Sequence, residues 1–470
     1  MKVTLISPYK MVWSPGIRIL SACLKREEYD VQVIFLPGDF TDKYEDTVLD
    51  EVVKLSVSSD LIGITLMTNF FDKAVQITQK LKESLSIPVI WGGIHPTIRP
   101  EECLDYADIV CRGEGEESVV ELVRKMEKGQ NYYNVKGMEF KVNGKIVKNQ
   151  IRPLIRDMDS IPFQDYTYDE HYILSEGYIR KMDEMVLKKY LGGAYEIMAT
   201  RGCAYGCAYC CNNTLNELHS NQRIVRKRSI DNIIKELMWV KKKLPFIECI
   251  KFDDDHFFTY TLKEIKDFCN EYKKNIGLTM HITGAHPNTI SREKLSLLVD
   301  ADLVFIRIGI QTGNERTKKL YGRNQTNRKV EEAVRIINSF RNKIRLPQYD
   351  IILDNPWEVD EDLIKTLMFL TKLPAPYYLE LLSLTFYPET QLYEKAKREG
   401  IIHDDLEEVY RKPEYHTCKK HYLNGLFFLL KEYVQRGENI PTKTMFLLTN
   451  RVLRKLKISW LLYKVLCAKN

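Results

Sequence analysis

The sequence predicts an α/β protein built on two parallel sheets. Short apolar segments of strand length alternate with amphipathic segments of helical length over residues 1–135, and the alternation returns over residues 191–400. This rhythm is typical of parallel strands covered by helices. Residues 136–190 interrupt it, and residues 401–470 show only helical patterning. We therefore expect a doubly wound domain, a linker, a second domain and a small helical C-terminal region.

Five strands are expected in the first domain. They are placed at 3–7, 31–36, 61–65, 89–91 and 109–111, with helices at 16–26, 48–57, 70–84 and 117–128. In such sheets, ligands bind beyond the carboxyl ends of the strands. The pair Asn143-Gly144 in the following segment favours a tight β-hairpin turn. The rest of that segment is polar and rich in Tyr and Asp, so we interpret 136–190 as a linker.

The second domain is expected to hold six βα units. Strands are placed at 196–200, 249–253, 279–283, 303–308, 349–353 and 378–384, and helices at 229–242, 261–274, 291–300, 327–340, 360–372 and 390–399. Ser229 and Ser291 are suitable N-caps for two of these helices. Six units are too few for a closed eight-stranded barrel, so a partial barrel or an open sheet is expected. Function belongs at the carboxyl ends of its strands.

A cysteine cluster follows the first strand of this second domain. Cys203, Cys207 and Cys210 have the spacing C-x3-C-x2-C in a glycine-containing loop. Thiolates favour soft metal centres, and a [4Fe–4S] cluster held by three cysteines keeps one iron open for another ligand. The alternatives are a zinc site, completed by Cys211 or His219, and a disulfide, which a reducing cytoplasm disfavours.

The cysteine motif, on the first loop of a six-unit βα domain, resembles that of radical S-adenosylmethionine (SAM) enzymes. Three later segments extend the resemblance: 251–257 after the second strand, 307–313 on the fourth, and 350–358 on the fifth. The fourth departs from the usual pattern, because Gln-Thr stands where Glu-Ser is common. The resemblance implies a [4Fe–4S] cluster on the three cysteines and SAM contacts from Tyr209, Asp253, Asp254, Gln311, Thr312 and Asp354.

The first domain resembles the cobalamin-binding domain that precedes the barrel in one large class of these enzymes. The resemblance rests on segments 63–68, 91–97 and 112–116, each at the carboxyl end of an expected strand. It implies cobalamin contacts from Thr65, Met67, Thr68, Gly92, Gly93, His95 and Glu114. His95 is expected to contact the loop or the nucleotide tail rather than to ligate cobalt, since the D-x-H-x-x-G signature is absent. Another nucleotide-like ligand, or a domain that has lost cobalamin, is the alternative.

The charge is concentrated at one end of the chain. The 470 residues carry a formal net charge of +6, and 440–470 contain seven Lys or Arg and no Asp or Glu. The rest is nearly neutral, which excludes a broad nucleic-acid-binding face. The basic, apolar tail predicts either peripheral membrane contact or a helix packed on the barrel. Without a signal peptide or a membrane span, we expect a cytoplasmic protein, free or at the inner face of the membrane.

Together these features predict an enzyme that cleaves SAM to a 5′-deoxyadenosyl radical. The leading hypothesis is cobalamin-dependent C-methylation of an unactivated carbon in a small-molecule or lipid-like substrate, with electrons from a donor such as flavodoxin or ferredoxin. No protein residue is assigned a catalytic role, because the radical itself removes hydrogen. One alternative is radical cyclisation, rearrangement or C–C coupling without methyl transfer. The other is a non-catalytic metal-binding module.

Overall fold

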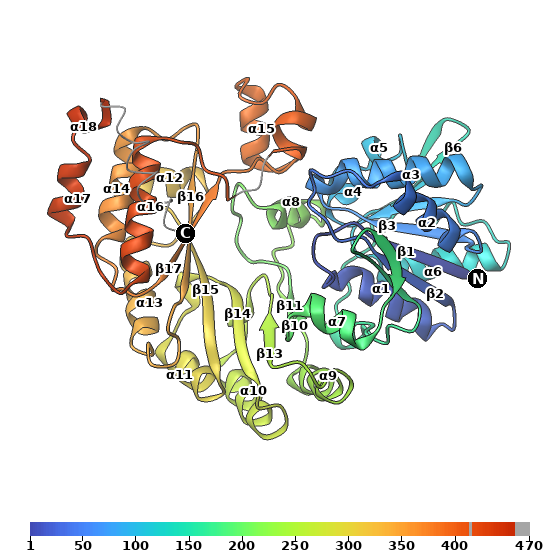
Figure 1. Cartoon of the computed structure of the whole chain (residues 1–470), viewed down its shortest axis with the longest axis horizontal. Helices are drawn as coiled ribbons and strands as arrows, with labels where there is room; N and C mark the ends of the chain where they lie inside the picture. Colours follow the sequence, from blue (N-terminus) through green and yellow to red (C-terminus); the bar gives the residue numbers. More distant parts are fainter. Residues whose placement is uncertain (413–415, 456–470) are drawn as a thin grey trace. The chain divides into compact units, whose positions relative to one another are not determined.

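The computed structural model describes residues 1–412 and 416–455. The chain divides into two compact units (Figure 1). The first unit comprises 1–193, 211–222 and 386–412. The second comprises 194–210, 223–385 and the described residues from 416 onward. Each unit therefore contains segments that are distant in the sequence.

The first unit is built on a nine-stranded sheet in the order β7-β6-β5-β4-β3-β1-β2-β8-β9. Its strands are β1 (Lys2–Ser7), β2 (Asp30–Phe35), β3 (Leu61–Thr65), β4 (Val89–Gly92), β5 (Ile109–Cys111), β6 (Met138–Val142), β7 (Lys145–Lys148), β8 (His171–Ser175) and β9 (Tyr178–Lys181). The five expected strands form its parallel centre. Strand order reverses between β1 and β3, and ligands bind at the carboxyl ends beside such a reversal.

Segment 136–190 does not form the linker expected from the sequence. It contributes β6 and β7 beside β5, and β8 and β9 beside β2. The expected hairpin is present: Asn143 and Gly144 have φ of 49° and 75°, which suits a two-residue turn. The linker prediction was wrong because the edge strands β7 and β9 are short and partly exposed. They therefore lack the continuous apolar run by which a central strand is recognised in the sequence.

The helices of the first unit largely match those expected. They are α1 (Pro15–Arg26), α2 (Asp46–Ser56), α3 (Phe71–Ser84), α4 (Ile94–Ile98), α5 (Pro100–Cys103), α6 (Gly115–Glu127), α7 (Glu184–Leu191), α8 (Cys211–Leu218) and α15 (Gln391–Arg398). Helix α15 was expected to complete the second domain. Instead it belongs to the first unit, where Tyr393 hydrogen-bonds both Arg99 and Asp405.

The second unit is a six-stranded parallel sheet in the order β10-β13-β14-β15-β16-β17. The strands are β10 (Ala194–Ile197), β13 (Cys249–Phe252), β14 (Thr279–Ala285), β15 (Leu303–Gln311), β16 (Gln348–Leu353) and β17 (Tyr378–Ser383). Strands β10 and β17 are its two edges, so the sheet is a partial barrel. The short pair β11 (Thr200–Arg201) and β12 (Arg226–Lys227) lies apart from it.

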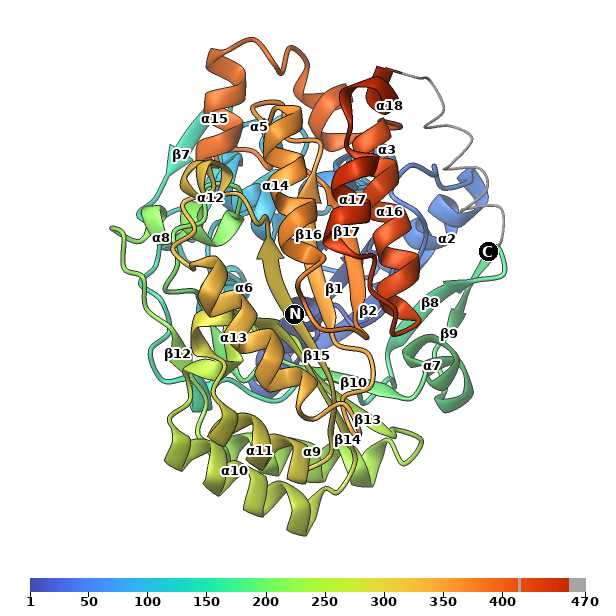
Figure 2. The same cartoon turned by 90° about the vertical axis from the view of Figure 1, so that its left-hand side faces the viewer.

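Helices follow the strands of this sheet as expected. They are α9 (Ile230–Lys243), α10 (Leu262–Asn275), α11 (Arg292–Asp300), α12 (Glu315–Leu320), α13 (Asn327–Asn338) and α14 (Asp360–Leu370). Figure 2 shows α9, α10 and α11 lying side by side, and they contact one another in that order. Ser229 and Ser291 cap α9 and α11 by accepting hydrogen bonds from backbone N–H groups, as the sequence predicts.

The two faces of the second sheet differ in character, because successive side chains of a strand point in opposite directions. One face is apolar and buried, with Tyr195, Ile250, Met280, Ile306 and Leu379 among its members. The other, which we call the charged face, carries one ionisable residue from each of the six strands: Glu196, Lys251, His281, Arg307, Asp350 and Glu380. A polar surface therefore runs across the sheet.

The C-terminal segment packs on the second unit as far as the structure describes it. Helix α16 (Tyr422–Gln435) contacts β17 and α14, and α17 (Thr442–Leu448) contacts α14. Arg454, in α18 (Arg451–Lys455), pairs with Asp360. Over 1–412 and 416–455, no helix has the length and apolarity needed to cross a bilayer. Most of the apolar tail, 456–470, lies outside the described residues.

Candidate functional site

The cysteine loop begins directly after β11 and is fixed at several points. Gly202 has φ +93°, and a Cβ there would lie 2.5 Å from the carbonyl oxygen of Ile224, so only glycine fits. The Gly202 N–H donates to Asp255 (3.1 Å), and the Ala208 N–H donates to the carbonyl of Tyr321 (3.0 Å). The loop is therefore held by the segments that follow β13 and β15.

The three cysteines of this loop lie within electrostatic reach of one another. Burial raises the pKa of Cys203 to about 12, and Cys210 and Cys207 contribute to the increase. Without metal the Cys203 thiol is thus protonated at neutral pH, and metal binding would displace the proton. The thiols do not converge on a single point: over the described residues, no group of three His, Cys, Asp or Glu side chains could hold a metal ion as it stands. The donor type and the shared loop nevertheless suit a three-cysteine cluster.

The zinc alternative depends on a fourth protein ligand. Its two candidates, Cys211 and His219, both belong to the first unit together with α8, whereas Cys203, Cys207 and Cys210 belong to the second. The division falls between two adjacent cysteines of the chain. Over the part of the chain that the structure describes, these side chains do not form a group of three or more ligands around one metal position.

Arg323 is a residue of this site that the sequence analysis missed. Its Nη1 donates to Cys207 Sγ (3.7 Å) and to the Tyr209 hydroxyl (3.2 Å), and its Nη2 donates to the carbonyl of Gly309. Burial acts to lower the pKa of Arg323, but Tyr209 and Cys207 outweigh it and the net shift is upward. Arg323 therefore stays charged. A lone arginine in a loop after α12 offers no spacing signal that would have identified it.

Two aromatic contacts line the same loop. The Tyr209 ring meets Tyr321 edge-on, with centroids 5.2 Å apart. The Tyr205 ring stacks on His286 at 3.9 Å and 17°. Burial lowers the pKa of His286 to about 2, with further lowering from Arg323 and His256, so its imidazole is neutral. His286 was not singled out from the sequence, because a histidine after a strand has many ordinary explanations.

The two predicted aspartates after β13 have different environments. Asp253 is exposed and accepts a hydrogen bond from Thr283 (2.5 Å). Asp254 is buried and accepts from both the backbone N–H and the hydroxyl of Thr200. Burial raises the pKa of Asp254 to about 7. Asp254 thus anchors the strand that leads into the cysteine loop, while Asp253 is available to a ligand.

The two predicted residues at the end of β15, Gln311 and Thr312, also have different environments. Gln311 has φ +70°, and its buried Oε1 has no hydrogen-bond partner. Thr312 is fully buried, and its hydroxyl is hydrogen-bonded to Thr366 (3.0 Å) and to the Asn314 N–H (3.1 Å). An unsatisfied buried oxygen is costly unless something binds it. Gln311 is consequently the member of the pair suited to a ligand.

Asp354, the predicted residue at the end of β16, is engaged with the C-terminal segment. Its carboxylate accepts from the Lys419 N–H (2.9 Å) and from Asn424 Nδ2 (2.8 Å). It has φ +61°, a conformation that turns the chain sharply after the strand. These contacts fasten the start of α16 to the sheet.

On the charged face, each cation stands beside a carboxylate. Lys251 pairs with Glu196 (2.6 Å), and Arg307 pairs with Asp350 (2.8 Å). The carboxylates are almost buried, whereas the side chains of Lys251 and Arg307 remain 24% and 36% exposed. Burial, together with Asp253, raises the pKa of Glu196 to about 7. The accessible part of this face is thus mainly cationic.

In the first unit, the predicted residues nearest to the reversal between β1 and β3 are Thr65, Met67 and Thr68, at the end of β3 and directly after it. The Tyr9 hydroxyl lies 3.0 Å from Thr65 Oγ1, and its ring packs on Phe70. Met67, two residues beyond β3, is 37% exposed. Tyr9 follows β1 and was not predicted as a ligand-binding residue, because the family resemblance rests on the loops after β3, β4 and β5 alone. The first strand's own loop belongs to the same crevice.

The loop after β4 is more enclosed than the sequence indicated. Gly93 has φ +111°, and a Cβ would lie 2.7 Å from the Leu66 carbonyl oxygen. His95 is fully buried, its Nδ1 is 3.2 Å from Thr68 Oγ1, and its ring packs against Tyr410. Burial lowers the pKa of His95 to about 3. Gly92 lies in β4 itself.

Glu114 lies at the N-terminus of α6. Its carboxylate accepts from the Ile155 N–H (2.8 Å). Glu114 therefore fixes the chain between β7 and β8 to the carboxyl end of β5.

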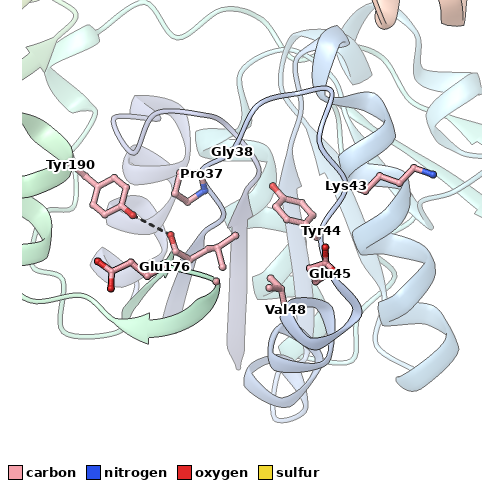
Figure 3. A pocket seen from close by; sticks show the side chains of 10 residues that line it. Pro37, Gly38, Lys43, Tyr44, Glu45, Val48, Glu176 and Tyr190 are labelled. Atoms are coloured by element: carbon pink, nitrogen blue, oxygen red, sulfur yellow. Dashed lines mark hydrogen bonds between the residues drawn. The ribbon is translucent and has the colours of Figure 1, made fainter.

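A separate cavity of about 420 Å³ lies at the carboxyl end of β2 (Figure 3). Gly38 and Tyr44 line one side, and Glu176 and Tyr190 line the other. None of the residues expected to bind cobalamin lines it. Its position beyond β2 places it one strand away from the reversal.

Comparison with known proteins identifies both domains of the chain. The radical SAM superfamily model matches residues 197–370, and the B12 binding domain model matches residues 1–123. An uncharacterized methyltransferase of Pyrococcus horikoshii is 28% identical over 392 residues, covering 81% of this chain and 78% of the relative. An anaerobic magnesium-protoporphyrin IX monomethyl ester cyclase of Rubrivivax gelatinosus is 25% identical, covering 69% of this chain and 56% of the relative.

A solved structure shares the fold. The radical SAM methyltransferase TsrM of Kitasatospora setae, with cobalamin and a [4Fe–4S] cluster bound, superposes with a TM-score of 0.66 at 19% identity. The match covers 85% of this chain and 78% of TsrM. The two domain matches identify the present chain as a radical SAM enzyme with a B12-binding domain, and these domains imply a [4Fe–4S] cluster, SAM and cobalamin as its cofactors. The alternative of a non-catalytic metal-binding module is therefore set aside.

Proposed function

We propose that this enzyme methylates an unactivated carbon of its substrate. The observation that carries the proposal is the presence, on one chain, of a three-cysteine loop after the first barrel strand and a B12-binding fold. When bound, the cluster and SAM supply a 5′-deoxyadenosyl radical, and cobalamin supplies the methyl group. The protein's own contribution is to bind, orient and exclude water.

We assign the cluster to Cys203, Cys207 and Cys210. For SAM, the contacts favour Tyr209, Asp253 and Gln311, because each has a polar group beside the cysteine loop or at a neighbouring strand end. Thr312 and Asp354 are proposed only as supports, since their polar groups are used within the protein, and Asp254 is proposed mainly as a support because its Oδ1 holds Thr200, although its buried Oδ2 has no protein partner. This division sharpens the six-residue set that the sequence suggested.

For cobalamin, the proposed contacts are the residues around the β1–β3 reversal. Thr65, Met67 and Thr68 follow β3, and Gly92 and Gly93 end β4 and begin its loop. Gly93 lets this loop lie close to the Leu66 backbone, and without a side chain it would also let a ligand approach the loop closely. His95 and Glu114 are proposed as supports of the site, because each is engaged with the protein itself.

The charged face of the second sheet indicates the polarity of the substrate. The partly exposed side chains of Lys251 and Arg307 lie beside buried carboxylates and would contact a molecule lying against the sheet. Leaving such cations against an apolar molecule is unfavourable. We therefore propose that the substrate presents polar or anionic groups to this face. A lipid-like portion, and contact of the tail with a membrane, remain separate expectations from the sequence.

A second outcome of the same chemistry is radical cyclisation without methyl transfer. The similarity to a protein named as a cyclase favours it specifically. Both outcomes need an external one-electron donor, for which flavodoxin or ferredoxin is the expected class. They differ in one product, because only methyl transfer converts SAM to S-adenosylhomocysteine.

The test is an anaerobic incubation with dithionite and SAM that carries a deuterated methyl group. The substrate source is a small-molecule extract of the native cells. Methylation predicts 5′-deoxyadenosine, S-adenosylhomocysteine and a product that retains the deuterated methyl group. Formation of 5′-deoxyadenosine with a changed metabolite, but without S-adenosylhomocysteine, would support cyclisation instead. Cys203→Ala should abolish all these products, and Cys211→Ala is the matched control.

A further inference from the structure

Arg323 presents an unusual electrostatic situation. Its guanidinium is only partly exposed, and over the described residues no carboxylate pairs with it. Its protein partners are two neutral oxygens, the Gln325 amide oxygen (3.0 Å) and a thiol sulfur. A cation withdrawn from water is costly without an anion nearby. The arrangement therefore indicates an anion that is part of the working enzyme.

The position of Arg323 is set by the backbone. The turn from Tyr321 to Arg323 presses against the cysteine loop, with the Tyr321 carbonyl accepting from Ala208 N–H. Gly322 has φ +63°, and a Cβ there would lie 2.7 Å from the Gly206 carbonyl oxygen. Gln325 accepts from Arg323 Nε and donates to the carbonyl of Ile310 (3.2 Å). The guanidinium is thus held in place from several sides.

One of its N–H groups points to a cluster ligand. Arg323 Nη1 lies 3.7 Å from Cys207 Sγ, within the range of an N–H···S hydrogen bond. When the cluster is present this sulfur is a thiolate. Hydrogen bonds and positive charge at the sulfurs are among the factors that set the reduction potential of iron–sulfur clusters.

We propose that Arg323 is a positioning residue that raises the reduction potential of the cluster through a charge-assisted hydrogen bond to the Cys207 thiolate. The inference rests on the proposed assignment of Cys207 as a cluster ligand. The step concerned is the gain of one electron by the oxidised cluster from an external donor, with no proton transferred. Reduction adds one negative charge, so a fixed cation beside the sulfur stabilises the reduced form more than the oxidised form. Arg323 thereby makes the cluster easier to reduce.

The test is a redox titration of the reconstituted holoenzyme without SAM, followed by the electron paramagnetic resonance signal of the reduced cluster. Arg323→Met should shift the midpoint potential to a more negative value. We expect at least a tenfold loss in the reduction equilibrium, which is about 59 mV for one electron. Arg323→Lys keeps the positive charge but not the planar set of guanidinium N–H donors, so a smaller shift in the same direction is expected. Arg341→Met, on an exposed arginine after α13, is the matched control.

Several outcomes would overturn the proposal. An Arg323→Met enzyme with full iron content and the potential of the unmodified enzyme would contradict it. So would an unchanged potential with weaker SAM binding, since the guanidinium would then serve the SAM carboxylate alone. If Arg323→Met retains no cluster, Arg323→Lys decides, and a potential equal to that of the unmodified enzyme refutes the inference. Absence of any cluster from the unmodified enzyme would instead refute the proposed function.

Discussion

Replacement of Asp254 tests how the cysteine loop is held. Both hydrogen bonds from Thr200 end on one carboxylate oxygen, Oδ1, and the other oxygen, Oδ2, is buried without a partner. Asp254→Ala removes the acceptor and leaves the buried N–H of Thr200 unsatisfied, at a cost of about 1–3 kcal/mol. Asp254→Asn keeps an oxygen in the accepting position. The two variants therefore separate loss of the hydrogen bonds from loss of the charge.

The assay is amide hydrogen exchange, measured by mass spectrometry on peptides that include Thr200 and the start of the loop. If the cost falls on local opening, Asp254→Ala should speed exchange of these amides by about 5-fold to 150-fold. Asp254→Asn should change it only slightly. Peptides from β17 serve as the internal control. Equal protection in the unmodified protein and Asp254→Ala would refute the anchoring role.

The protection of the amides around Thr200 from hydrogen exchange should decrease as the pH rises. Burial raises the pKa of Asp254 to about 7, well above the value of the carboxyl in the unfolded chain. Its contribution to stability is therefore fully present at low pH and is lost as the pH rises through about 7. After correction for intrinsic exchange rates, protection around Thr200 should fall as the pH rises from about 4 to about 7, and it should level off above that pH because the carboxyl is then ionised in both states. Asp254→Asn should show no such fall.

Three further predictions address the cofactor sites. Gly93→Ala places a Cβ 2.7 Å from the Leu66 carbonyl oxygen at φ +111°, which should cost about 1–3 kcal/mol and lower the cobalt content of the purified enzyme; an unchanged cobalt content would contradict the role of this glycine. Tyr9→Phe removes the hydroxyl beside Thr65, and we expect faster loss of cobalamin on dialysis; an unchanged rate would contradict a role for Tyr9. Single changes of Cys203, Cys207 or Cys210 to Ala should each abolish 5′-deoxyadenosine formation, while Cys211→Ala should preserve it, and activity in any of the first three would disprove the cluster assignment.

Much of the fold follows from periodicity, because central parallel strands are buried on both faces and read as short apolar runs. The expected strands at 61–65 and 109–111 coincide with β3 and β5. The edge strand β9 could not be recognised in this way, since none of its residues is buried, and β7 was indicated only by the Asn143-Gly144 turn and not by an apolar run. The apolar periodicity of the sequence also could not show that α8 and α15 belong to the first unit. Such long-range packing depends on tertiary contacts that adjacent residues do not encode.

The sites show the same division between local and distant information. The cysteine motif is local, so its spacing alone identified the loop. Arg323 lies over a hundred residues further along the chain and reaches Cys207 only through the fold. Asp254 and Asp253 are adjacent in sequence, but the alternation along the strand end buries one and exposes the other. The family resemblance indicated which segments hold the cofactors. Burial and hydrogen bonding in the structure then separated the residues proposed to contact a cofactor from those proposed to support the site.

The central claim is that one chain holds both a three-cysteine cluster and cobalamin. Its most direct test is metal analysis of anaerobically purified protein, combined with the visible spectrum. We expect about four iron atoms per chain and about one cobalt atom per chain, with the iron lost in a variant lacking all three motif cysteines. Zinc in place of iron, or iron that persists in that variant, would contradict the cluster assignment. Iron without cobalt after supply of cobalamin would contradict the cobalamin site.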